Sequence, residues 1–363
     1  MKTVFHEGKG FPLKGGITTG TCAALAAKAA ALLLLEGERR ERVVVPLPDG
    51  TRLSYMISAL SGDSSEATAT VVKDAGDDPD VTHGTDILVT VKANDLHDIR
   101  FLAGDGVGIV SRAGLAIPPG EAAINPGPRQ MIRAALAEVS DGGFDVTVSV
   151  PAGTELAEKT FNPRLGIVGG ISILGTSGRV RPFSAPALRD ALKCSLDVAV
   201  AAQIKKLVLV PGHMGNKAAQ RYFTVGPEQI VDVGNEWGYM LAETAKHQFE
   251  HILVVGHPGK LAKLAQGQWQ THSAQSDSAV PYVSGLAEKL FDQELSQVNT
   301  VEEVFMEFLD VDQRLQLGNR VATAVRYQIE RTYRQLPQIA VVLINLKRQI
   351  IGQSGNFAPV VKK

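Results

Sequence analysis

The chain has 363 residues, of which 44% are hydrophobic and 21% are charged, and its formal net charge is −1. This length predicts two domains, and this composition is typical of a globular protein. A charge so close to zero argues against binding of nucleic acid through overall charge. The two cysteines, Cys22 and Cys194, form neither a disulfide framework nor a CxxC metal motif. Because the first residues lack the apolar core of a secretory signal, we expect a cytoplasmic protein.

The first 155 residues have the pattern of an α+β domain. Thr18 to Thr21 precede an Ala- and Leu-rich run, which predicts a capped, buried helix over Cys22–Leu35. This run is shorter than the ~20 residues that span a bilayer, so we expect no membrane segment. Many strands with few helices favour a largely antiparallel sheet. The strands are expected at Arg42–Val45, Thr51–Ile57, Ala67–Lys73, Asp86–Lys92 and Phe144–Val150, and a helix at Arg129–Val139.

From residue 156 onward strands and helices alternate, which indicates a Rossmann-like parallel α/β domain. The expected strands are Gly166–Val168, Leu207–Val210, Gln229–Val233, Ile252–Val255 and Gln338–Leu346. The expected helices are Pro186–Gln203, Asn216–Phe223, Trp237–Gln248, Lys260–Gln266 and a helical stretch over Val283–Arg334. The predicted fold class is therefore α/β, with an α+β domain over residues 1–155 and the Rossmann-like domain over 156–363.

Three glycine-rich loops in this second part are candidate cofactor sites. Residues 160–178 combine glycines with bulky apolar anchors, whereas the loops at 207–219 and 252–265 both run strand, glycine, histidine, glycine, lysine, helix. Ligands of doubly wound sheets bind beyond the carboxyl ends of the strands, so we expect all three loops at one edge. A structural turn without a ligand is the alternative for residues 160–178. The candidate residues are Gly169, Gly170, Gly175, Thr176, Gly212, Gly215, Gly256 and Gly259.

Asp232 and Asn235 lie at and just after the end of the strand that follows the first histidine loop, where such side chains bond ribose hydroxyls. A solvated loop or a helix cap is the alternative for each. The GxxxxGK[ST] and GxGxxG patterns are absent, so neither nucleoside triphosphate nor dinucleotide binding has a motif. His213, His257 and His272 match no metal-ligand spacing, and we expect no protein-bound metal.

The first domain contributes candidate acid/base and carboxylate-binding groups. Residues 73–84 place four aspartates beside Lys73 and His83. Neighbouring carboxylates raise one another's pKa, so Asp77 and His83 are candidates for proton transfer, with solvated turn residues as the alternative. Arginines on glycine- and proline-rich loops suit bidentate binding of carboxylates, although surface arginines without a ligand are common. The candidates for this role are Arg112, Arg129 and Arg164.

Six segments together resemble the cobalt-precorrin-5B C(1)-methyltransferases of anaerobic cobalamin biosynthesis. They extend from near the N-terminus to about residue 277. The chain departs from the family pattern at His213-Met214, where the family has an Asn-Tyr pair, and at residues 274–279. The six segments are GITTGTCAALAAKAA (16–30), KDAGDDPDVTHG (73–84), GVGIVSRAGL (106–115), INPGPRQMI (124–132), TFNPRLGIVGGISILGTSG (160–178) and GHPGKLAKLAQGQWQTHS (256–273).

The resemblance implies a two-domain enzyme that transfers the methyl group of S-adenosylmethionine to C-1 of cobalt-precorrin-5B, giving cobalt-precorrin-6A. The cobalt then belongs to the substrate, and the glycine loops with Asp232 or Asn235 hold the donor. We expect a small corrinoid as partner, without nucleic acid or membrane, and the sequence leaves a homo-oligomer open. Proton transfer is expected from Asp77 or His83, and substrate binding from Lys73, Arg112, Arg129, Arg164, Thr271 and His272.

Two other classes of function stay open at this point. A nicotinamide-dependent reductase fits the Rossmann-like pattern, although the missing GxGxxG motif counts against it. A non-catalytic corrinoid carrier or scaffold binds the macrocycle without changing it. The sequence fixes neither the catalytic base nor the order of substrate binding, nor whether cobalt-free corrinoids are accepted.

Overall fold

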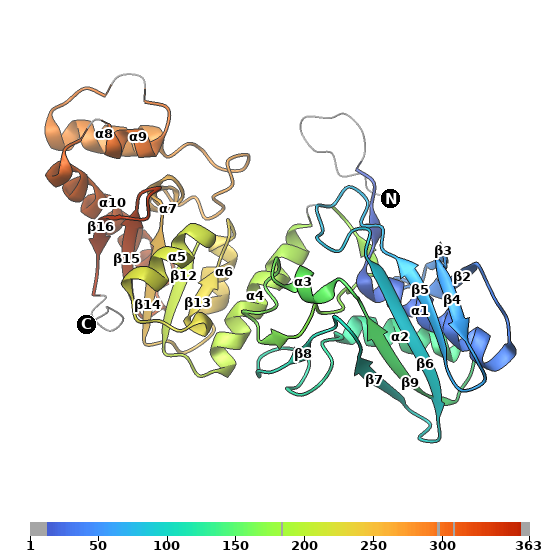
Figure 1. The fold of residues 1–363 in the computed structure, drawn as a ribbon. Coiled ribbons are helices and arrows are strands. Elements are labelled where there is room, and N and C mark those ends of the chain that lie inside the picture. The colour runs from blue at the N-terminus through green and yellow to red at the C-terminus, as the bar shows by residue number, and fades with distance from the viewer. Residues whose placement is uncertain (1–12, 183, 296–297, 308, 357–363) are drawn as a thin grey trace. The chain divides into compact units, whose positions relative to one another are not determined.

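The computed structural model describes residues 13–182, 184–295, 298–307 and 309–356, which divide into two compact units (Figure 1). The units are Met1–Ala185 and Pro186–Lys363. The sequence predicts a division after residue 155, whereas the structure assigns residues 156–185 to the first unit. The reason is backbone pairing, because Ile167, Ile171 and Ile173 bridge to residues between 107 and 124 of the same unit.

A mixed five-stranded sheet forms the framework of the first unit, in the order β4-β5-β6-β9-β7. Three neighbouring pairs are antiparallel, as predicted, and β7 runs parallel to β9. Alternate residues of β5 face the core, for example Ala67, Ala69 and Val71. The strands are β4 (Ala59–Gly62), β5 (Ala67–Val72), β6 (Asp86–Asn94), β7 (Ile99–Ala103) and β9 (Gly143–Ser149).

The central helix α1 (Thr19–Glu36) packs against β5, β6 and α2 (Pro126–Ala137). Thr18 caps it, since its hydroxyl oxygen accepts a hydrogen bond from the Thr21 N–H at 3.2 Å. The helix is long and apolar enough to span a membrane by length and composition alone. However, 72% of its apolar window is buried inside the protein, which is typical of a core helix.

The remaining strands of the first unit are short. The sequence predicts Gly166–Val168 as the first strand of the parallel sheet, and this is wrong, because β10 pairs antiparallel with β8 in the first unit. A two-residue strand has too little hydrophobic pattern to show which sheet it joins. The elements are β1 (Gly16–Ile17) paired with β11 (Arg179–Val180), β2 (Arg42–Pro46) with β3 (Arg52–Met56), β8 (Ile109–Val110) with β10 (Ile167–Val168), and helix α3 (Gly153–Ala157).

The second unit contains the predicted Rossmann-like sheet, in the order β13-β12-β14-β15-β16. The first four strands of that order are parallel, and the edge strand β16, which was not predicted, is antiparallel to β15. The central strand β14 is buried along its whole length, as parallel strands covered on both faces are. The strands are β12 (Lys206–Val210), β13 (Ile230–Asp232), β14 (His251–Gly256), β15 (Gln338–Ile344) and β16 (Ile350–Ser354).

Helices cover both faces of this sheet. α5 packs on the face that contains Val208 and Val255, whereas α6, α7 and α10 pack on the face that contains Leu209 and Val254. The predicted helical stretch at 283–334 consists of three helices, since Thr300 and Asp310 each cap a new one. The elements are α4 (Ala185–Ala201), α5 (His213–Tyr222), the 3₁₀ turn η1 (Pro227–Gln229), α6 (Trp237–Thr244), α7 (Pro258–Ala265), α8 (Val280–Phe291), α9 (Val301–Met306) and α10 (Val311–Thr332).

Two helical glycines provide a matched test of this packing. On α10, a Cβ at Gly318 would overlap the carbonyl oxygen of Ile351 on β16, so Gly318→Ala is expected to lower the free energy of unfolding by about 1–3 kcal/mol. On α8, no described atom lies within 4 Å of a Cβ at Gly285, so Gly285→Ala is expected to raise it by about 0.5–1 kcal/mol. Urea denaturation measures both, and a Gly318→Ala protein as stable as the parent would contradict the α10–β16 contact.

Candidate functional site

The chain reverses its winding direction between β12 and β14. From β12 it crosses to β13 on one side, and from β14 it continues to β15 on the other. In open α/β sheets this reversal leaves a crevice at the carboxyl ends of the two strands, where ligands bind. The loops after both strands meet there, since a Cβ on Gly256 would lie 2.9 Å from the ring of Pro211. Two of the three predicted loops therefore lie at one edge.

Gly212 opens the β12 side of this crevice. Its φ of 137° and ψ of −162° favour glycine, and no described atom lies within 4 Å of a Cβ built there. α5 begins at the next residue, and no side chain in the described structure caps its first turn. The N–H groups of that turn therefore face the crevice without a side-chain acceptor, which suits a polar or anionic ligand. Gly215 has a packing role, because its Cβ would lie 2.7 Å from the carbonyl oxygen of Val255.

Asp232 ends β13 beside this loop. It is in register with Val210, the last residue of β12, and its side chain is buried. It follows Gly212 by about 20 residues, the spacing at which an acidic residue bonds ribose hydroxyls in dinucleotide folds. Asn235 is engaged by Thr271, whose hydroxyl donates to its Oδ1 at 3.2 Å and whose N–H donates to its carbonyl oxygen at 3.1 Å. Asn235 thus has a structural role, and the ribose contact expected of Asp232 stays a prediction.

His257 is the N-cap residue of α7, and its own side chain caps the helix. Its Nδ1 accepts a hydrogen bond from the Gly259 N–H at 3.0 Å, and its Nε2 lies 2.9 Å from Oε2 of Glu302 on α9. Because Nδ1 accepts, the neutral imidazole has its proton on Nε2 and donates to Glu302. The other oxygen of Glu302 accepts from the N–H of Leu346, just after β15. Gly256 and Gly259 thus allow close contacts within the protein, with the ring of Pro211 and with the imidazole of His257. The hydrogen bonds of His257 hold the loop in position.

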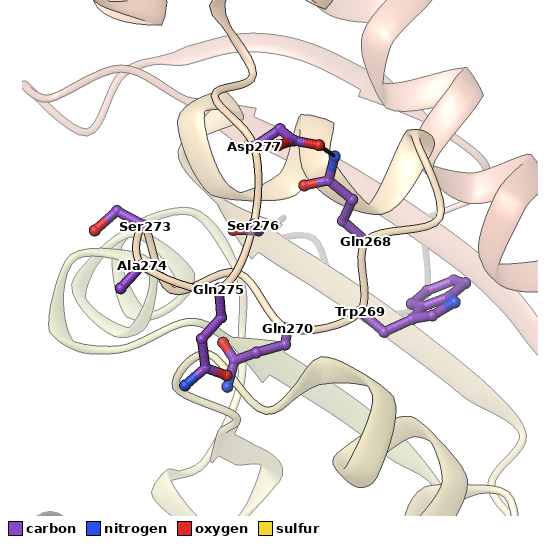
Figure 2. Close-up of a pocket in the computed structure, with 8 residues that line it drawn as sticks. All are labelled: Gln268, Trp269, Gln270, Ser273, Ala274, Gln275, Ser276 and Asp277. Carbon is purple, nitrogen blue, oxygen red and sulfur yellow. Dashed lines mark hydrogen bonds between the residues drawn. The ribbon is translucent and has the colours of Figure 1, made fainter. Parts of the chain in front are cut away.

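Within the loop of residues 268–277, called the 268–277 loop below, residues 268–270 and 273–277 line a cavity of about 650 Å³ (Figure 2). Gln268 donates to Asp277 at 3.2 Å and so joins the two ends of the loop. Gln270 donates to Glu236 at 2.6 Å, and the other oxygen of Glu236 accepts from Arg189. Amide and hydroxyl groups dominate the lining, so the cavity suits a polar ligand.

The structure separates the two predicted substrate residues of this loop. Thr271 is buried, and its hydrogen bonds to Asn235 hold the loop beside the end of β13. His272 is exposed, and its Nδ1 accepts from the Ala274 N–H at 3.2 Å, which leaves the proton on Nε2 as a donor. The substrate contact expected of His272 stays a prediction, whereas Thr271 has a structural role in this fold. Across the described ranges, no group of three or more His, Cys, Asp or Glu side chains could hold a metal ion.

The glycine loop at 160–178 belongs to the first unit, and Gly170 and Gly175 in it serve packing. A Cβ on Gly170 would overlap the carbonyl oxygen of Gly106, and a Cβ on Gly175 would overlap the side chain of Thr18. The expectation that this loop lies at the edge of the parallel sheet is wrong, because its strand β10 is not part of that sheet. Gly169 and Thr176 are the exposed members of the predicted set.

The polar turn at 73–84 has its own internal order. Lys73 is 2% exposed, and its ammonium donates to Asp80 at 2.6 Å. Burial alone would raise the pKa of Asp80, but hydrogen bonds from Lys73 and Thr82 hold it below its ordinary value. Burial raises the pKa of the adjacent Cys22 thiol to about 12, so this cysteine is no nucleophile. The ammonium of Lys73 thus forms an ion pair within the turn, with Asp80.

The two predicted proton-transfer groups differ in exposure and in hydrogen bonding. Asp77 is exposed and accepts from the Lys14 N–H at 2.6 Å. The Nδ1 of His83 accepts from the Ala75 N–H at 3.0 Å, so the neutral ring has its proton on Nε2. His83 in this form donates a hydrogen bond and does not act as a base through Nε2.

Next to this turn lies a second cavity, of about 590 Å³. Met56 and Val72 are 50% and 40% exposed there, and Arg42 is in register with Met56 on the β2–β3 hairpin. Exposed apolar side chains beside cationic and N–H donors suit a flat ligand that carries carboxylates. The lining residues are Arg42, Tyr55, Met56, Ser58, Val72, Lys73, Asp74, His83 and Gly84.

The three predicted arginines make different contacts. The guanidinium of Arg129 donates to the carbonyl oxygens of Ile124 and Ala122, at 2.8 and 3.2 Å, and pairs with Glu121 at 2.8 Å. Arg129 thus braces its own loop. The guanidinium of Arg164 lies 5.8 Å from the ring centroid of Phe161, and the stem of Arg112 packs beside Gly166.

Two features of the carboxyl edge were not predicted. Glu302 is far from His257 in sequence, and no local pattern relates the two. Lys263 is buried in α7, one turn after Lys260. In the sequence, only the three-residue spacing of these lysines in PGKLAKLA indicates that they are neighbours on one helix.

Comparison with known proteins gives matches over nearly the whole chain. The family described as CbiD matches residues 6–182, and the family described as CbiD, C-terminal domain, matches residues 270–355. A cobalt-precorrin-5B C(1)-methyltransferase of Syntrophotalea carbinolica is 49% identical over 96% of this chain and 99% of its own. The protein of that name from Methanocaldococcus jannaschii is 37% identical over 93% and 96%. A crystal structure of the cobalamin biosynthesis protein (cbiD) from Archaeoglobus fulgidus is 29% identical with a TM-score of 0.39, covering 67% of this chain and 77% of that one.

The His257–Glu302 contact can be tested by a double-mutant cycle. His257→Ala removes the side-chain cap of α7 and is expected to lower the free energy of unfolding by about 1–2 kcal/mol. Glu302→Ala removes the acceptor of Nε2, so the effects of the two changes should not add. Chemical denaturation of both single variants and the double variant measures the coupling. Strict additivity would show that the imidazole and the carboxylate do not interact.

Proposed function

Because this chain belongs to the CbiD family of cobalt-precorrin-5B C(1)-methyltransferases, we propose that it transfers a methyl group from S-adenosylmethionine to C-1 of cobalt-precorrin-5B. The near-full-length similarity to proteins of that name carries the proposal. The product is cobalt-precorrin-6A, and the cobalt enters and leaves with the substrate.

The donor is proposed to bind in the crevice between β12 and β14. Three observations support this position: the space beside Gly212, the uncapped first turn of α5, and the buried carboxylate of Asp232. The carboxylate suits ribose hydroxyls, and the N–H groups suit polar atoms of the donor. When bound, S-adenosylmethionine supplies an electrophilic methyl group on a sulfonium.

The contribution of the chain to such a reaction is alignment. Methyl transfer to carbon is an in-line displacement, and holding the two reactants in near-attack geometry lowers the barrier by about 7–11 kcal/mol. The acceptor is proposed to rest in the cavity beside β3 and β5, with its carboxylates on Arg42 and the Nε2–H of His83. Arg112 and Arg164, which belong to the same unit as this cavity, are proposed as further contacts to carboxylates.

A single assay separates this function from its alternatives. Purified protein is incubated with S-adenosylmethionine and cobalt-precorrin-5B, and the corrinoid is analysed by mass spectrometry. We expect the mass gain of one methyl group, together with S-adenosylhomocysteine as the second product. A bound corrinoid of unchanged mass would indicate a carrier, and consumption of a nicotinamide cofactor would indicate a reductase.

Asp232→Asn tests the donor site. The change keeps the shape of the side chain but removes the charge that strengthens hydrogen bonds from ribose hydroxyls, so S-adenosylhomocysteine should bind about 10–100-fold more weakly. Isothermal titration calorimetry measures this. The matched control is Asp190→Asn, on the exposed side of α4 in the same unit, which should leave the affinity unchanged. Equal affinities for the parent and Asp232→Asn would place the donor elsewhere.

A further inference from the structure

Helix α7 carries two lysines that lie one turn apart. Lys263 is 6% exposed, and its Nζ donates to Ser276 Oγ at 2.8 Å and, more weakly, to the Thr271 carbonyl oxygen at 3.4 Å. Both acceptors are neutral groups on the 268–277 loop. Lys260 lies one turn earlier and is half-buried. Within the described ranges, neither ammonium forms an ion pair with a carboxylate.

The electrostatics of Lys260 are unfavourable in three respects. Burial, and then the charge of Lys263, lower the pKa of its ammonium. Its position in the first turn of α7 also places a cation at the positive end of the helix dipole. Two carboxylates at this edge are already committed, Glu302 to His257 and Glu236 to Arg189 and Gln270.

A buried or half-buried charge without a counter-ion is costly, and a charged group is kept in such a place where a ligand brings the opposite charge. α7 starts directly after the β14 loop, so the first of these lysines stands at the mouth of the β12–β14 crevice. We propose that Lys260 and Lys263 form a carboxylate-binding site at the start of α7, beside the 268–277 loop. This inference rests on the proposed function for the identity of the carboxylate.

A purely structural role would explain Lys263 alone. Its bond to Ser276, whose hydroxyl in turn donates to the His272 carbonyl oxygen at 2.8 Å, anchors the loop. Lys260 has no such bond among the described residues and therefore carries the inference. Two carboxylates are available in the reaction: that of the donor's methionyl group and those on the side chains of the acceptor.

The main test is Lys260→Met, with Lys289→Met on the exposed side of α8 as the matched control. Affinities are measured by calorimetry for S-adenosylhomocysteine and for 5′-methylthioadenosine, which keeps the nucleoside but lacks the carboxylate. If the donor's carboxylate binds here, the variant should lose about tenfold in affinity for the first ligand only. If the acceptor's carboxylates bind here, both affinities should stay unchanged while the KM for the acceptor rises about tenfold. Lys260→Arg should restore either loss.

A second measurement does not depend on methyl transfer. Without ligand, Lys260→Met removes an uncompensated charge and should raise the Tm of the protein by about 2–4 °C, whereas Lys289→Met should not. Citrate, compared with chloride at equal ionic strength, should raise the Tm of the parent more than that of Lys260→Met. If the parent fails to bind S-adenosylhomocysteine but both effects on Tm appear, the proposed function fails and the carboxylate site stands. Unchanged affinities, KM and Tm in a folded Lys260→Met protein would overturn the site.

Discussion

The backbone of β12 is hydrogen-bonded on both edges, to β13 and to β14, and the chain leaves β12 and β14 in opposite directions. A buried parallel strand has to satisfy its N–H and C=O groups in this way, and right-handed crossovers then place α5 on one face of the sheet and α6 and α7 on the other. The crevice at the carboxyl ends is a consequence of this pairing. The sheet thus sets the positions of Gly212, Asp232 and the start of α7 at this edge.

Close backbone contacts support this arrangement in both units. In the second unit Gly215 allows α5 to start against β14, and Gly318 allows α10 to lie against β16. In the first unit Gly170 meets the backbone of Gly106, which joins two segments that are far apart in sequence. Substitution at such packing glycines is as restricted as at ligand-binding glycines. At a packing glycine an added Cβ would collide with protein atoms, and at a ligand-binding glycine it would collide with the ligand. Of the glycines at the carboxyl edge, Gly212 alone combines a positive φ with free space around it in the described structure.

Much of the fold follows from local patterns in the sequence. The apolar run after Thr18 predicts α1, and the β-branched runs that end at Val210 and Val255 predict β12 and β14, because burial and capping leave clear signals over several residues. The partner of β10 and the boundary at residue 185 were not predictable in this way. Both depend on pairing between distant segments, which no local period records. The same contrast between local and distant signals applies to two residues of the candidate site. The position of Asp232 at the end of a predicted strand identifies it in the sequence, whereas only the contact with His257 in the structure identifies Glu302.

The order of the strands has a consequence for the newly made chain. β14 is buried along its whole length and apolar after His251, and one of its edges is covered by β15, which is synthesised only after α7, α8, α9 and α10. Until residues 338–344 leave the ribosome, that edge lacks its partner. Such an unpaired, apolar edge is a template for association with other chains, and non-local pairing of this kind is slow to form. The nascent protein therefore passes through an interval in which this edge is open to association with other chains.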